Sequence, residues 1–172
     1  MSFASGHIIG GYTFGKIYEK IKHLKIPQSA WFFIIFGALL PDADLIIEWV
    51  FKIDAHRLLT HSFLFLIATP LLILAIFHLI KNPNKKIFAL ALMLGIASHL
   101  TLDFCTTQGI PLLYPNLTHF SIYGINENAL TNPSFLHQGT AGLQTSLKLA
   151  VVDMALGAGF LFYLWWKKRI QF

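Results

Sequence analysis

Four long stretches of the chain are almost entirely apolar, with few polar positions interrupting them. They span residues 30–51, 58–80, 87–104 and 147–166. Each is close to the roughly 20 residues that a helix needs to cross a hydrocarbon core about 30 Å thick. The second stretch contains no Asp, Glu, Lys or Arg, and Pro70 within it should kink the helix rather than end it. The pattern predicts an all-α, integral membrane bundle of about four transmembrane helices.

The composition also favours a membrane protein. Hydrophobic residues make up 55% of the 172 positions and charged residues only 12%, about half of the usual share in a soluble globular domain. A very apolar soluble helical domain is the alternative. The length suits one domain, residues 1–172. Cys105 is the only cysteine, so an internal disulfide is excluded.

Basic residues lie in three clusters between the apolar stretches and give an orientation. If all three clusters are cytoplasmic, four crossings satisfy the positive-inside rule without conflict. A nucleic-acid partner is disfavoured, because nucleic-acid binding requires basic residues on one exposed face. The clusters are Lys16, Lys20, Lys22 and Lys25; Lys81, Lys85 and Lys86; and Lys167, Lys168 and Arg169.

In this orientation, residues 52–57 and the long stretch 105–146 lie on the outer side. The long stretch is rich in Asn, Thr, Gly and Pro and is too long for a bare connector, so we expect it to fold over the membrane face as a lid or binding loop. Residues 3–25 are predicted to form a partly embedded or re-entrant helix that leads into an amphipathic helix on the cytoplasmic surface.

Two aspartates interrupt the first apolar stretch. Ionisable side chains at membrane depth normally face a cavity, a partner or an ion. Asp42 and Asp44 follow Pro41, which suits the first turn of a new helix whose positive end would face the acids. Near a helix start, both acids can turn toward a single ion. The alternative is an ordinary loop with two solvated acids.

Two further groups carry histidine. The segment HRLLTHS opens the second stretch and places Arg57 and His61 one helical turn apart; its alternative interpretation is an interfacial helix start with polar caps. His99 and Asp103 are four residues apart, which places an imidazole and a carboxylate side by side on a helix. That spacing suits two ligands of one metal, or a histidine oriented by a carboxylate. A buried His–Asp pair that only stabilises the bundle is the alternative.

The orientation given by the lysines brings these groups to one depth on the outer side. Three separate segments that deliver His and Asp to one level predict a metal site. Imidazole and carboxylate ligands without a usable cysteine favour zinc, with manganese or iron as alternatives. The predicted ligands are Asp42, Asp44, His61, His99 and Asp103.

Other residues are candidates for the same site. His7 can add a ligand if the N-terminal segment folds back into the bundle, since the glycines at positions 6, 10 and 11 allow close helix approach. Asp153, in the outer third of the last stretch, is a candidate ligand or an acceptor for a ligand. The loop residues His119, Glu127 and His137 can reach the site only if the loop folds toward it.

Three motifs, LLPDAD, HRLLTHS and ASHLTLDFCTTQGIPLLYP, resemble the YdjM-type family of inner-membrane predicted metal-dependent hydrolases, in this order and over nearly the whole chain. A more distant likeness is to zinc-dependent phospholipase C and the related single-strand nucleases. The chain lacks their N-terminal tryptophan ligand and a second His-x-x-x-Asp motif, so the likeness implies one or two metal ions. The positions that match their ligand order are His7, Asp42 or Asp44, His61, His99 and Asp103.

The resemblance and the depth of the site favour a metal-dependent hydrolase in a bacterial-type inner membrane, with its site toward the outer face. A bound zinc would lower the pKa of water toward 7. We expect His56 to transfer a proton to the leaving group and Arg57 to pair with a phosphate or other oxyanion. A hydrolytic site at headgroup depth would encounter membrane lipids before soluble compounds. We therefore expect the substrate to be a phosphoester or ester of a membrane lipid or lipid-linked compound.

Two other functions compete with this one. A cation or proton-coupled transporter also uses broken helices and intramembrane acids, but it predicts acids along a pathway to both faces. A non-catalytic membrane scaffold would leave the clustered His and Asp unexplained.

Overall fold

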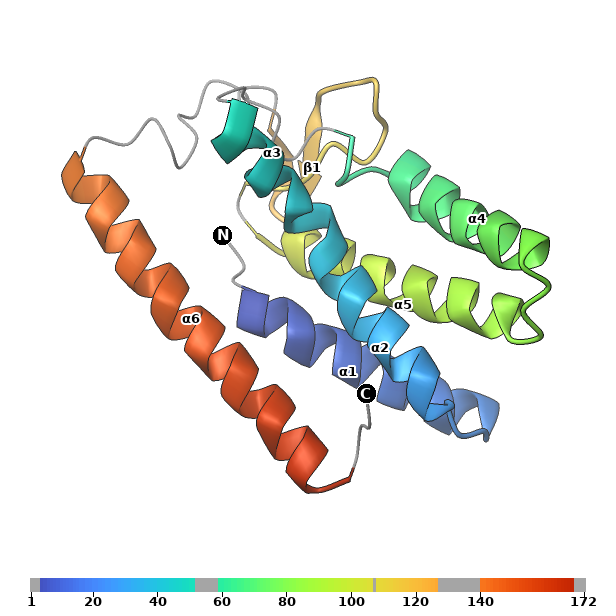
Figure 1. Cartoon of the computed structure of the whole chain (residues 1–172). Helices are drawn as coiled ribbons and strands as arrows, with labels where there is room; N and C mark the ends of the chain where they lie inside the picture. The colour runs from blue at the N-terminus through green and yellow to red at the C-terminus, as the bar shows by residue number, and fades with distance from the viewer. Residues whose placement is uncertain (1–3, 52–58, 107, 127–139, 169–172) are drawn as a thin grey trace.

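Helices make up most of the described protein in the computed structural model (Figure 1). The structure describes residues 4–51, 59–106, 108–126 and 140–168, without the side chains of residues 46–49, 126 and 140–150. The helices are α1 (Ala4–Lys22), α2 (Gln28–Leu39), the 3-10 helix η1 (Leu40–Ala43), α3 (Asp44–Phe51), α4 (Phe63–Leu79), α5 (Lys85–Phe104) and α6 (Thr140–Trp166). Two short strands, β1 (His119–Ser121) and β2 (Gly124–Asn126), form an antiparallel hairpin. The predicted all-α class is therefore correct for the main architecture.

Among the described helices, α2 and α5 share the most extensive contact, where α2 crosses α5 (Figure 1). Gly37 of α2 and Gly95 of α5 lie at this crossing. A Cβ atom on Gly95 would be 2.2 Å from the carbonyl oxygen of Ile34, and one on Gly37 would be 2.5 Å from that of Leu92. Only glycine allows the two backbones to approach so closely.

The first apolar stretch breaks where the sequence predicts it. α2 ends at Leu39, η1 covers Leu40–Ala43, and α3 begins at Asp44. Pro41 lies in the first turn of η1, where its missing N–H costs no helical hydrogen bond. The break therefore falls at Asp42 and Asp44, at the end of α2 that lies near the last turns of α5.

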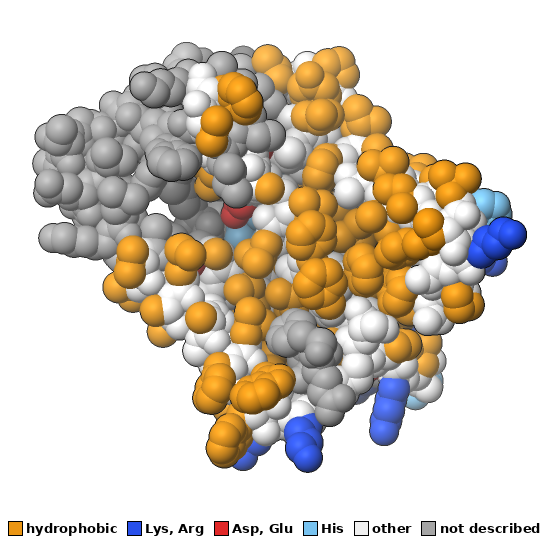
Figure 2. All heavy atoms as spheres, viewed as in Figure 1, with side chains coloured by type: hydrophobic (Ala, Val, Ile, Leu, Met, Phe, Trp, Pro, Cys, Tyr) orange, Lys and Arg blue, Asp and Glu red, His pale blue; other side chains and the backbone are white. Residues whose placement is uncertain are grey.

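α4 and α6 lie on the outside of the bundle and expose apolar side chains. α4 packs against α5, and α6 packs against α1. α4 begins after Ser62, whose Oγ accepts a hydrogen bond from the N–H of Phe65, and it runs through Pro70 as predicted. Figure 2 shows a wide apolar surface across the face of the molecule that it displays. Exposed apolar side chains on α4 and α6 include Leu71, Leu72, Val151, Met154, Phe162 and Trp166.

Among the described helices, α5 alone is both long and apolar enough to cross a membrane. It has 20 residues, close to the roughly 20 that a membrane-spanning helix needs. Three further apolar helices are shorter, at 10–17 residues: Gln28–Ala43, Phe63–Leu79 and Val151–Trp166. The structure thus supports one candidate span, and the four predicted crossings stay a prediction.

The N-terminal segment differs from its expected form. Residues 4–22 form one continuous helix, α1, which packs against α2, α5 and α6. The side chain of His7 and the backbones of Gly11 and Gly15 line its buried face, spaced one turn apart. A Cβ on Gly11 would lie 2.9 Å from that of Ala38 in α2. Glycine therefore brings α1 close to the bundle, as expected for Gly11.

Candidate metal centre

Four side chains from three separate segments meet at one end of the bundle. Asp42 comes from η1, His61 from the turn before α4, and His99 with Asp103 from α5. Each of the four offers one ligand atom, and these atoms all lie within 4.8 Å of one another. His61, His99 and Asp103 are buried, and Asp42 is partly buried. The sequence prediction that these segments converge is therefore correct.

The distances between these ligand atoms are short and similar. The Nε2 atoms of His61 and His99 are 3.1 Å apart. Asp42 Oδ1 lies 3.4 Å from His61 Nε2 and 3.5 Å from His99 Nε2. Asp103 Oδ2 lies 3.4 Å and 3.7 Å from the same two nitrogens. One nitrogen or oxygen of each residue is thus directed toward a common point.

The outer nitrogen of each histidine is held by the surrounding protein. His99 Nδ1 is 2.7 Å from the carbonyl oxygen of Ala38, which can only accept a hydrogen bond. Nδ1 therefore carries the proton, and Nε2 of a neutral His99 presents a lone pair to the cluster. This hydrogen bond lies one turn beyond the contact of Gly95 with α2, so the close crossing sets the position of the ring.

Asp44 and Thr60 hold His61 from its other side. Asp44 Oδ2 lies 3.7 Å from His61 Nδ1, on the side of the ring away from the common point. Thr60 Oγ1 donates a hydrogen bond of 2.5 Å to Asp44 Oδ2 and lies 3.0 Å from His61 Nδ1. Such outer partners fix the orientation of metal-binding histidines. Asp44, predicted as a ligand, thus lies outside the group of four.

His7 reaches the same cluster from α1 and is fully buried. Its ring stacks on that of His99, with centroids 3.6 Å apart. Its Nε2 is 3.5 Å from Asp103 Oδ1 and 3.9 Å from Asp42 Oδ2. Each of these carboxylates therefore directs one oxygen toward the two histidines of the group and the other toward His7.

The acidic neighbours raise the pKa of His61 above the ordinary value of 6.5. Burial alone would lower this pKa, but hydrogen bonds with Asp103 and Asp42 and the charge of Asp44 outweigh burial. His61 lies in the turn before the first residue of α4. Without a cation, this buried cluster therefore tends to hold a proton on His61.

The other candidate residues are distributed as follows. His56, Arg57, Glu127 and His137 lie outside the described residues. His119 is buried on β1, with Nδ1 3.3 Å from the carbonyl oxygen of Gln108. The hairpin that carries it folds back on α5, since the N–H of Ile122 bonds to the carbonyl oxygen of Phe104 at 3.1 Å. Part of the predicted outer loop thus packs over the end of the bundle that holds the cluster.

Asp153 contacts α1 instead of the four-residue group. Its Oδ2 accepts a hydrogen bond of 3.0 Å from the N–H of Ser5, and its Oδ1 accepts one from Ser5 Oγ. Sequence reasoning did not identify Ser5 or the carbonyl oxygen of Ala38, and it gave Thr60 of the HRLLTHS segment no role. Nothing in the local sequence marks a residue as a partner of a distant side chain.

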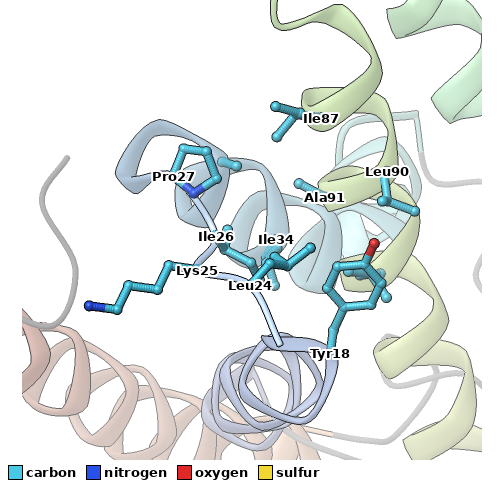
Figure 3. A pocket seen from close by; sticks show the side chains of 11 residues that line it. Tyr18, Leu24, Lys25, Ile26, Pro27, Ile34, Ile87, Leu90 and Ala91 are labelled. Atoms are coloured by element: carbon cyan, nitrogen blue, oxygen red, sulfur yellow. The ribbon is translucent and has the colours of Figure 1, made fainter. Parts of the chain in front are cut away.

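The opposite end of the bundle carries the described lysines of the three basic clusters and no described candidate ligand. We call it the lysine end; it comprises the last turns of α1, α4 and α6 and the first turns of α2 and α5. In Figure 2, Lys side chains appear along the lower and right-hand edges, away from a small red and pale-blue area of Asp and His. An apolar pocket of about 220 Å³ also lies at this end, between α1, α2 and α5 (Figure 3). Ile34, Ile87 and Leu90 line this pocket, so it is distinct from the His–Asp cluster, which comprises His7, Asp42, His61, His99 and Asp103.

Comparisons with known proteins assign the chain to a family. An uncharacterised protein of Bacillus subtilis strain 168, YvsG, is 29% identical over 145 residues, which is 78% of this chain and 78% of that protein. No solved structure is significantly similar. The profile of the YdjM inner membrane protein family matches residues 1–170. Because this match covers all but the last two residues, the chain belongs to the YdjM inner membrane protein family.

Proposed function

We propose that this protein is a membrane-bound, metal-dependent hydrolase whose metal centre is formed by Asp42, His61, His99 and Asp103. One observation carries the proposal, namely the spacing of the four ligand atoms. At metal–ligand distances of about 2.0–2.2 Å, two ligand atoms of a tetrahedral zinc site lie about 3.3–3.6 Å apart. The five distances given above run from 3.1 to 3.7 Å and are centred on that range, with three of them inside it.

The chemistry of the ligands supports zinc. Two imidazole nitrogens and two carboxylate oxygens are zinc ligands, and the outer hydrogen bonds of His99 and His61 are those expected of metal-binding histidines. A cation would also offset the burial of several acidic groups in an apolar bundle. His7 Nε2, Asp42 Oδ2 and Asp103 Oδ1 form a neighbouring set of ligand atoms, which supports a second ion.

When bound, a divalent ion of this kind supplies Lewis acidity and activates water for hydrolysis at neutral pH. The chain's own residues hold and orient the ligands: Ala38 fixes the tautomer of His99, while Asp44 and Thr60 fix the ring of His61. We retain His56 and Arg57, from the segment before α4, as the proposed proton donor and oxyanion-binding residue.

Location suggests the substrate class. The family is one of inner membrane proteins, and we propose four crossings: residues 28–51, α4, α5 and α6. Exposed apolar side chains on α4 and α6 suit contact with lipid, and the lysine end suits the cytoplasmic side. The cluster would then lie at the outer headgroup level. The proposed substrate is a phosphoester or ester of a membrane lipid or lipid-linked compound.

The transporter alternative receives no support from the described residues. It requires ionisable groups along a path between both faces. The buried acidic residues in the described part, Asp44, Asp103 and Asp153, instead lie in or near the His–Asp cluster. Hydrolysis thus remains the better proposal.

The test uses protein purified in detergent. We expect the wild type to retain zinc and to release products from a total lipid extract in a chelator-sensitive manner. His99→Ala and Asp103→Asn should lose both properties. His78→Ala is the matched control, because His78 is exposed at the lysine end. Zinc-containing wild-type protein that leaves every lipid class intact would refute the lipid substrate, and wild-type protein without a transition metal would refute the hydrolase.

A further inference from the structure

Asp153 is a buried acid on a helix whose neighbouring side chains face outward. It is 7% exposed, whereas Val151, Val152 and Met154 are 65%, 58% and 67% exposed. An acid in such an apolar helix requires a partner. That partner is Ser5 of α1, which donates to both oxygens of the Asp153 carboxylate.

These hydrogen bonds cap α1 from another helix. α1 begins at Ala4, so the N–H of Ser5 is among those at the helix start that have no partner within the helix. The first turn of α1 contains no acidic residue of its own. The carboxylate of Asp153 supplies the negative charge that stabilises the positive end of a helix.

His7 lies in the same turn of α1 that Asp153 caps. One turn after Asp153, Gly157 lets α6 approach α1: a Cβ there would lie 3.1 Å from Ile8 Cδ1 and 3.4 Å from Ser5 Cα. α6 therefore fixes α1 at Ser5 and Ile8, on both sides of His7 in sequence. The ring of His7 then reaches Asp103 and Asp42 at 3.5 and 3.9 Å.

We infer that Asp153 is a positioning residue for His7: it ties the first turn of α1 to α6 and so holds the His7 imidazole at the two shared carboxylates. This inference rests on the proposed metal centre, because the ion that Asp153 would help to bind is the proposed second ion, which has His7 as a ligand. Asp153 is not among the residues whose ligand atoms converge, and both of its oxygens bond to Ser5.

A double-mutant cycle tests the inference, with zinc affinity measured by chelator competition on full-length protein in detergent. Asp153→Ala should weaken binding of one zinc equivalent by about 10- to 100-fold, the range found for outer partners of metal ligands, and His7→Ala should weaken binding of the same equivalent by at least as much. The double variant should bind no more weakly than His7→Ala. Leu164→Ala is the control, because Leu164 is buried in α6 near the lysine end, and it should bind as the wild type does.

A second readout needs no metal. In metal-free protein, carbethoxylation of His7 by diethyl pyrocarbonate should rise several-fold in Asp153→Ala, with exposed His78 as the internal reference. If Asp153→Ala does not remain monodisperse, Ser5→Ala replaces it, since that change removes one of the two hydrogen bonds.

If the fold-losses of zinc affinity in the two single variants multiply in the double variant, the positioning role is overturned. A wild-type zinc affinity in Asp153→Ala would overturn it as well. Wild-type protein that binds no zinc would refute the proposed metal centre itself. In that case increased carbethoxylation of His7 would still show that Asp153 holds α1, and unchanged carbethoxylation would overturn that claim too.

Discussion

Adding one methyl group at Gly95 should separate the two helices that build the site. In Gly95→Ala, the new Cβ would start 2.2 Å from the carbonyl oxygen of Ile34 and 2.8 Å from the backbone nitrogen of Ala38. Ordinary contacts are roughly 3.5 Å. Both obstacles are backbone atoms, so α2 and α5 must move apart by about 1 Å.

That movement has two expected consequences. Overpacking typically costs about 1–3 kcal/mol of stability. The separation also stretches the hydrogen bond of 2.7 Å between His99 and Ala38, one turn from Gly95, and moves Asp42 away from the α5 ligands. We expect zinc affinity to fall about 10- to 100-fold, as it does when an outer partner of a metal ligand is lost.

Thermal unfolding and chelator competition measure these two effects in detergent. Gly159→Ala is the matched control, because a Cβ on Gly159 in α6 would have no neighbour within 4 Å. Its stability should be unchanged or raised by roughly 0.5–1 kcal/mol, since alanine favours a helix more than glycine does. Gly95→Ala protein with wild-type stability and zinc affinity would show that the close crossing does not set the site.

Three further predictions concern the ligands and the topology. Thr60→Val removes the hydrogen bonds of Thr60 with Asp44 and His61, so zinc affinity should fall about tenfold in the chelator competition assay. Thr13→Val is the control, because Thr13 lies on an exposed part of α1, and it should leave zinc affinity unchanged. Because its carboxylate neighbours raise the pKa of His61 above 6.5, the metal-free protein holds this proton to a higher pH than a free histidine does. Zinc binding must release the proton, so zinc affinity should fall as the pH is lowered through this raised pKa. Calorimetry in two buffers of different ionisation enthalpy would show the released proton, and identical heats in both buffers would contradict the prediction. Reporter fusions after Lys85 and Asn126 should give cytoplasmic and outer signals respectively; a cytoplasmic signal from Asn126 would reverse the orientation.

The sequence was sufficient where the determining pattern is local. Apolar length predicted the four main helical regions, and the i, i+4 spacing placed His99 and Asp103 on one face of α5. Pro41 marked the break that η1 occupies. Convergence of the three segments followed from topology, because the lysine clusters gave each apolar stretch a direction.

The remaining features depend on contacts between distant segments. Residues 105–126 contain no strong strand pattern, and the hairpin forms because Phe120 pairs with Ile110 and the segment packs on α5. The partnership of Ser5 with Asp153 joins positions 148 residues apart. The placement of Asp44 behind His61 depends on how η1 meets α3, which residue spacing alone does not determine.

X-ray absorption spectroscopy at the zinc edge tests the central claim most directly. Protein loaded with one equivalent of zinc should show a shell of nitrogen and oxygen at about 2.0–2.2 Å with the outer scattering of two imidazoles. His99→Ala should lose at least one imidazole contribution. A six-coordinate oxygen shell without imidazole, the same in the wild type and in His99→Ala, would contradict a metal centre at the His–Asp cluster.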